Sequence, residues 1–170
     1  MEKQKIISIT SIIIIIAIVC FSSVNIYALG NLEIKGIDNS FRLFEMSTDD
    51  TIKICNNSPV PVFFHQFNFV IFFDGEPLGV FVINPENIMP YSKLEADGKY
   101  ISDSMAQSQS IFMHFDHMFS SDGTIRIDPN KMSIITQFHT NIIGIPYVVS
   151  EKYNSVDFWN MLNEQSNSDC

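Results

Sequence analysis

The side chains in this sequence best suited to bind a transition metal are its four histidines, two of which lie close together. Residues 114–118 read His-Phe-Asp-His-Met. On a helix, His114 and His117 are three positions apart and share one face, with Asp116 or Met118 nearby. Imidazole nitrogens suit copper and zinc, so the pattern predicts a metal site at His114 and His117.

A complete site of this kind needs a third or fourth ligand from elsewhere in the chain. His65 and His139 are the other two histidines, and no spacing in the sequence brings them to the first pair. The competing interpretation is that these histidines face solvent or are hydrogen-bonded to neighbours. Both interpretations stay open at the level of sequence.

Patterns for other chemistries are missing from the sequence. It contains no His-Glu-x-x-His, no Cys-x-x-Cys, no Gly-x-Ser-x-Gly and no glycine-rich phosphate loop. The paired carboxylates Asp49 and Asp50 lie in turn-like polar sequence, where a solvated loop is the expected structure. We therefore expect a protein that is not an enzyme and has no cofactor.

The three cysteines separate into one in an apolar segment and two that follow it. Cys20 lies in that segment, so Cys55 and Cys170 are the candidates for a disulfide. The alternation in Ile52-Lys53-Ile54-Cys55 favours a buried thiol in a strand instead. Cys170 would then be left unpaired near the C-terminus.

The N-terminus indicates export. Lys3 and Lys5 precede an apolar stretch over residues 6–24, which is about long enough to cross a bilayer. Lysines before such a segment favour a cytoplasmic N-terminus, which places the rest of the chain outside. We expect a single-pass protein of the cell membrane with its C-terminal domain outside, or a secreted protein.

The choice between these two depends on cleavage. Ile26-Tyr27-Ala28 is a tolerable signal-peptidase site, although its β-branched isoleucine replaces the usual small residue. The apolar stretch is long for a signal peptide, which slightly favours a retained anchor that contacts the membrane through residues 6–24.

The charge balance argues against anionic partners. The chain carries a formal net charge of −9. Eight Lys and Arg side chains and eighteen Asp and Glu side chains follow residue 28, which gives the outer domain about −10. Nucleic acids and anionic lipid headgroups need a cationic face, so we expect neither as a partner.

The body of the chain reads as short strands separated by turn residues. Strands are predicted over residues 32–35, 41–46, 51–55, 62–73, 78–83, 93–100 and 124–127. Asp74-Gly75 is the strongest hairpin signal. A further long run over 132–149 contains Gly144 and Pro146 and should be bent, bulged or at a sheet edge.

Two segments depart from the strand pattern. Apolar residues at helical spacing predict a helix over 102–119, capped by Ser102 or Asp103. A short helix over 155–162 follows the last strand, and the tail beyond Asn163 looks disordered. These boundaries divide the chain into an anchor or signal at 1–28, a β-domain at 29–153 and a helix with a tail at 154–170.

The strand predicted over residues 62–73 is rich in phenylalanine and has two faces. One is formed by Phe67, Phe69, Ile71 and Phe73, and the other by Gln66, Asn68, Val70 and Phe72. Core packing is the expected use of the aromatic face. An exposed apolar patch that captures unfolded proteins or a lipid chain is the alternative. With this many strands, one β-sandwich is the predicted fold.

Part of the central sequence resembles a known family. Residues 52–62 read Ile-Lys-Ile-Cys-Asn-Asn-Ser-Pro-Val-Pro-Val, and Ile88-Met89-Pro90-Tyr91-Ser92 follows the hairpin. This pattern is similar to the LEA14-like, water-stress and hypersensitive-response (WHy) domain of archaeal type, over about residues 31–150. The family has Asn-Pro where this chain has Asn56-Asn57, with its proline displaced to Pro59.

The resemblance implies an all-β, immunoglobulin- or fibronectin-III-like sandwich, here with one inserted helix, a short C-terminal helix and the N-terminal helix. It also implies a stress- or desiccation-related module of the cell envelope that binds or protects other molecules without catalysis. The alternatives are a copper- or zinc-binding envelope protein and an accessory subunit of a membrane complex.

Overall fold

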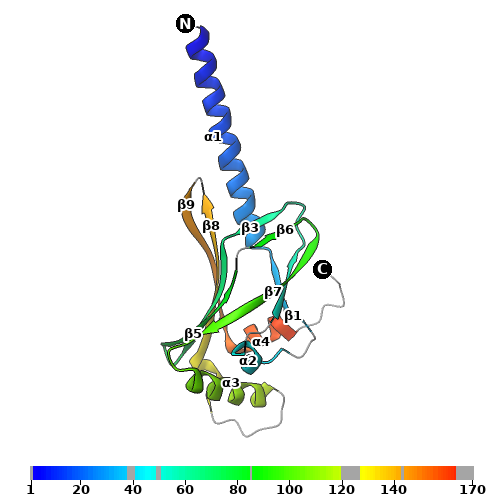
Figure 1. The fold of residues 1–170 in the computed structure, drawn as a ribbon, viewed down its shortest axis with the longest axis vertical. Helices are drawn as coiled ribbons and strands as arrows, with labels where there is room; N and C mark the ends of the chain where they lie inside the picture. Colours follow the sequence, from blue (N-terminus) through cyan, green and yellow to red (C-terminus); the bar gives the residue numbers. More distant parts are fainter. Residues whose placement is uncertain are drawn as a thin grey trace.

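A long N-terminal helix stands out from a mostly β domain (Figure 1). The structure is a computed structural model that describes residues 2–37, 41–48, 51–84, 86–119, 127–142 and 144–163, with side chains from residue 4 onward. The helix, α1, spans Glu2–Leu29. Within it Gln4–Leu29 is apolar enough to cross a membrane or to serve as a signal sequence, and an 18-residue window of it has a mean hydropathy of 2.7. The predicted N-terminal apolar helix is confirmed.

The described strands form a large sheet of seven strands and a small one of two, all paired antiparallel. In spatial order the large sheet is β1 (Glu33–Gly36), β2 (Thr51–Asn56), β7 (Ser92–Ile101), β5 (Glu76–Ile83), β4 (Gln66–Phe73), β8 (Met132–Ile142) and β9 (Ile145–Asn154). The small sheet pairs β3 (Val62–Phe64) with β6 (Glu86–Ile88). The fold is mostly β, as predicted.

The large sheet curls at β7, which belongs to two halves. Ser92–Asp97 pairs with β2, and Gly98–Ile101 pairs with β5. A side chain at residue 98 would begin only 1.9 Å from the ring of Phe81, so glycine is needed at this corner. The curl gives the domain its sandwich-like form.

A short helix lies between the two edges of the curled sheet. α4 (Ser155–Asn163) contacts both β1 and β9, which are the edge strands (Figure 1). Asn154 caps it, because the Asn154 Oδ1 atom accepts the Asp157 N–H at 2.8 Å. Its fully buried Phe158 meets the ring of Phe69 edge-on, with 5.1 Å between centroids. The predicted C-terminal helix is confirmed and helps to complete the core.

The core is rich in phenylalanine. Phe67, Phe69 and Ile71 of β4 are fully buried, as the alternation predicted. Phe67 stacks on Phe138 of β8 with 4.0 Å between ring centroids. Burial of each such ring stabilises the fold by about 1.5–3 kcal/mol. The aromatic face of β4 is therefore core and not an exposed patch.

The predicted strand over 41–46 is wrong. Leu43–Met46 form a single helical turn, α2, whose first N–H groups are bound by a side chain of α3 (Met105–Phe119). That side chain is Asp116, whose carboxylate accepts the Leu43 and Phe44 N–H groups at 2.8 Å each. A tertiary contact thus fixes the conformation of α2.

Two longer predicted strands are each divided. The run over 132–149 is a hairpin of β8 and β9, in which Gly144 adopts a φ of 78°, and β9 is the edge strand that tolerates Pro146. The run over 62–73 breaks at His65 into β3 and β4. Most of the predicted strand 124–127, Asp49-Asp50 and the tail beyond Asn163 lie outside the described residues.

Cys55 is buried, as predicted, but it is not a free thiol. It is disulfide-bonded, which corrects the prediction of a thiol in the core. Among the described cysteines, Cys20 is free and exposed on α1. Cys170 lies outside the described residues. A structural disulfide fits the extracytoplasmic location expected for the β-domain.

Candidate functional site at the junction of α1 and the β-domain

The last two turns of α1 belong to the β-domain. Asn25, Ala28 and Leu29 are 7%, 1% and 1% exposed, whereas the apolar residues before them are exposed. The helix ends at Leu29, and the N–H of the following Gly30 donates to the Ile26 carbonyl at 3.1 Å. The chain thus continues from the apolar helix into the core with no linker between them.

Asn25 joins α1 to β3 through its side-chain amide. Its Oδ1 atom accepts the Phe63 N–H at 2.9 Å, and its Nδ2 atom donates to the Phe63 carbonyl at 3.1 Å. The same Nδ2 atom donates to the Thr140 hydroxyl of β8 at 3.2 Å. Because the amide satisfies both backbone groups of Phe63, it takes the place of a neighbouring strand. This arrangement holds the helix in one orientation on the β-domain.

A cleft of about 620 Å³ lies beside this amide. Its helix side carries Phe21 and Ser22, and its strand side carries His65, Glu86, Asn87 and Asn141. Phe21 and Phe63 both line it, and their ring centroids are 6.1 Å apart. Both sides of the cleft thus combine aromatic rings with polar side chains, and Glu86 is its one acidic lining residue among the described residues.

Two of the four histidines, His65 and His139, are hydrogen-bonded to amides. The Asn141 Nδ2 atom lies 2.8 Å from the His65 Nε2 atom, and the Asn68 Nδ2 atom lies 3.2 Å from the His139 Nε2 atom. Each amide can donate to the ring when the proton is on Nδ1. These contacts favour a structural role for His65 and His139.

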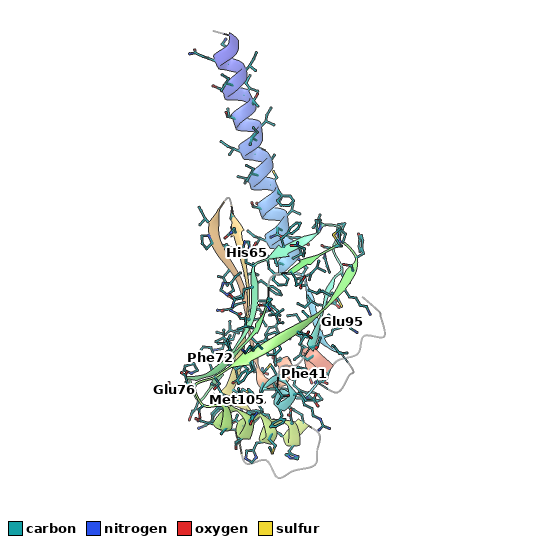
Figure 2. The ribbon with its side chains drawn as sticks, viewed as in Figure 1. Phe41, His65, Phe72, Glu76, Glu95 and Met105 are labelled. Atoms are coloured by element: carbon teal, nitrogen blue, oxygen red, sulfur yellow. The ribbon has the colours of Figure 1, made fainter. Side chains whose placement is uncertain are left out.

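The predicted metal pair lies at the other end of the domain. His114 and His117 are exposed on α3, which begins at Met105, and Figure 2 shows Met105 far from His65. The structure therefore does not bring the four histidines together. Among the described residues, no group of three or more His, Cys, Asp and Glu side chains could hold a metal.

Asp116, the third member of the predicted cluster, is engaged elsewhere. Its carboxylate caps α2 through Leu43 and Phe44. Burial raises the pKa of Asp116, while the two backbone N–H donors and Arg42 oppose that rise. The residue is therefore a structural cap that joins two helices.

Asn56 is a structural residue that sequence reasoning did not identify. Its side chain is buried, and its Nδ2 atom donates to the Val60 and Met89 carbonyls at 2.8 and 3.0 Å. It joins the turn after β2 to the turn before β7. Asn56-Asn57-Ser58 matches a glycosylation pattern, but this buried amide is unsuited to carry a glycan.

Asn25 was also missed, although the sequence holds a signal for it. It is an amide directly after a long apolar run, where a polar side chain needs a partner. Its partners Phe63 and Thr140 are distant in sequence, so only the fold reveals them.

Comparison with known proteins places the chain in no family. No family model matches it, and no curated protein matches it. Among solved structures, one of a protein from Archaeoglobus fulgidus is similar with a TM-score of 0.33 and 14% identity, over 62% of this chain and 81% of that one. A FixG-related protein from Vibrio parahaemolyticus gives a TM-score of 0.26 and 10% identity, over 73% and 94% of the two chains. Both TM-scores are below 0.5, so neither likeness assigns a fold type or a function.

Proposed function

We propose that this chain is a membrane-anchored, non-enzymatic binding module on the outer side of the cell membrane, in which α1 is retained. The observation that supports retention is the amide of Asn25, whose oxygen and nitrogen lie 2.9 and 3.1 Å from the backbone of Phe63. A signal peptide that is removed has no need of such a contact with the mature domain.

The position of the possible cleavage sequence, residues 26–28, also supports retention of α1. Cleavage after Ala28 would remove Asn25 and Ala28 from the packed end of the domain and make Leu29, which is 1% exposed, the new charged N-terminus. Burying an unpaired charge there is costly. Residues 26–28 are also helical and packed at Ala28, which hinders access by a protease.

The orientation and the partners follow from charge. Lys3 and Lys5 favour a cytoplasmic N-terminus, so the acidic domain lies outside. Its charge of about −10 disfavours nucleic acid and anionic surfaces, which leaves neutral lipid and other envelope proteins as partners. An accessory role in a membrane complex is one form that such binding takes.

The finer fold type and the protective role rest on the sequence resemblance. Similarity to the archaeal-type LEA14-like and WHy domains supports an immunoglobulin- or fibronectin-III-like sandwich and a role under osmotic or drying stress. Full-length protein in nanodiscs should then slow the aggregation of a dried or heated test enzyme. Empty nanodiscs are the control, and equal aggregation with both would contradict the protective role.

Retention of α1 is tested by fractionation of native cells and by the mass of the protein. We expect the full-length mass in the membrane fraction, resistant to extraction at high pH. A soluble protein that begins at residue 29 would overturn the proposal. Co-purification from the same membranes identifies protein partners.

A metal-binding envelope protein is the second candidate. The exposure of His114 and His117 on one face of α3 favours it, because both rings are accessible to an ion.

A further inference from the structure

We propose that the tip of the β8–β9 hairpin inserts into the outer leaflet of the membrane that α1 crosses. This inference rests on the proposed retention of α1. The hairpin tip consists of residues 141–142 and 144–148. The hairpin runs beside α1 toward its N-terminal end (Figure 1).

The depth of the tip follows from one hydrogen bond. The Thr140 hydroxyl of β8 lies 3.2 Å from the Asn25 amide of α1, so these two residues share one level. β8 continues for two residues beyond Thr140, or roughly 7 Å at the usual rise of a strand. The same distance along a helix corresponds to about four residues, which leads from Asn25 to Phe21. The hairpin tip therefore reaches the level of Phe21.

That level lies inside the apolar segment. The stretch over residues 6–24 is about 28 Å long as a helix, which matches the hydrocarbon thickness of a bilayer. Phe21 stands near its outer end, within about 5 Å of the boundary. Such a shallow depth is typical of elements that lie in a membrane interface.

The composition of β9 changes at the depth that this geometry predicts. Its first residues are apolar and exposed on both faces of the strand, with Ile145, Tyr147 and Val148 being 67%, 43% and 40% exposed. Beyond Val149 the strand becomes polar, beginning with Ser150 and Glu151. An edge strand in water is normally protected by charges, and an apolar one invites aggregation. Contact with lipid explains why this end of β9 carries no protective charges.

The free edge of β9 limits how deep the tip can lie. Backbone groups without partners are costly in hydrocarbon, so an open edge is suited to the interface and not to the bilayer centre. Pro146 has no N–H, which removes one such donor from the tip. The partner is accordingly the acyl–headgroup boundary of a neutral lipid, contacted through apolar side chains.

A fluorescent label on a single cysteine tests the insertion in the full-length protein. Ile145→Cys in a Cys20→Ser background is labelled without reduction, so that the Cys55 disulfide persists, and is reconstituted into phosphatidylcholine vesicles. Lipids with a quencher at shallow acyl depth should quench this label about as strongly as a label on the native Cys20 of α1. Glu151→Cys in the same background is the matched control farther along β9 and should show no quenching by lipid.

The labels at Cys20 and at residue 145 distinguish the proposed insertion of the hairpin tip from the proposed retention of α1. Quenching at Cys20 but not at residue 145 would overturn the insertion and leave the anchor standing. Loss of quenching at both positions would show that α1 is not in the bilayer, and would overturn both. A residue-145 label shielded from water but not quenched by lipid would indicate a protein contact and would also overturn the insertion.

Discussion

The side-chain amide of Asn25 in α1 pairs with both the N–H and the carbonyl of Phe63 in β3. A helix that is apolar enough to cross a membrane is thereby bonded to the β-domain, and Thr140 of β8 is a further partner of the same amide. Truncation of this amide leaves the Phe63 N–H without its acceptor, whereas the Phe63 carbonyl still accepts the Thr140 hydroxyl at 3.2 Å.

Asn25→Ala should lower the free energy of unfolding by about 1–3 kcal/mol, the cost of an unsatisfied buried group. Denaturant unfolding of the full-length protein in detergent measures it. Asn31→Ala is the control, since Asn31 is an exposed amide just after α1 that bonds to the Tyr27 carbonyl of that helix. Equal losses in the two variants would contradict the structural role of Asn25.

The two faces of β4 should respond differently to truncation. Phe69 is fully buried against Phe67, Phe81 and Phe158, so Phe69→Ala should cost about 3–5 kcal/mol through the cavity that it leaves. Phe72→Ala removes the same ring from the opposite, half-exposed face and should cost clearly less. Thermal unfolding of both variants measures these losses of stability. A larger loss in Phe72→Ala than in Phe69→Ala would refute the assignment of the two faces.

Asp116 should make stability depend on pH. Burial raises its pKa above the usual 3.8, so between 3.8 and the raised pKa the folded protein binds more protons than the unfolded one. The contribution of Asp116 to stability therefore falls as pH rises through that window.

Asp116→Asn, which cannot titrate, provides the comparison. The free energy of unfolding of the wild-type protein, relative to that of this variant, should fall as pH increases above 3.8. The difference between the two proteins should become constant once the pH exceeds the raised pKa of Asp116. Denaturation at a series of pH values measures it. A wild-type advantage that grows with pH would contradict the raised pKa.

Metal titration decides the second candidate function. If His114 and His117 form an envelope metal site, calorimetry should show copper or zinc binding tighter than about 0.1 mM. The double variant His114→Ala, His117→Ala should abolish it. The matched control His65→Ala, His139→Ala should bind normally, because those rings are bound by amides at the other end of the domain. Weaker binding, or binding that survives the first double variant, would eliminate the candidate.

The cysteines should differ in reactivity. Cys20 is free and Cys55 is disulfide-bonded, so maleimide added to the unreduced, denatured protein should modify Cys20 and leave Cys55 intact. Reduction should then expose Cys55 to the reagent. Peptide mapping reads both results, and modification of Cys55 before reduction would contradict the disulfide.

Local signals in the sequence accounted for several elements. The lysines followed by a long apolar run predicted the N-terminal helix, and the alternation of β4 predicted the burial of Phe67, Phe69 and Ile71, because both depend on neighbours along the chain. Phe73, on the same predicted face, is only partly buried. Asp74-Gly75 likewise predicted the turn between β4 and β5, where both residues adopt positive φ.

Other features depend on contacts between distant residues. Residues 41–46 carry an apolar pattern that suits a strand, yet Asp116 caps part of them as a helix. The spacing of His114 and His117 could not show that Asp116 between them turns to another partner. The prediction of a free Cys55 thiol failed for the same reason, since alternation indicates burial but not bonding.

An apolar N-terminal helix followed by an acidic, mostly β domain could be predicted from the sequence, because hydrophobicity, charge and strand period are properties of successive residues. That the helix ends inside the domain could not be predicted, because it depends on tertiary contacts. The bonds from Asn25 to Phe63 and Thr140 join three segments that are distant in sequence, and such convergence exists only in the folded domain.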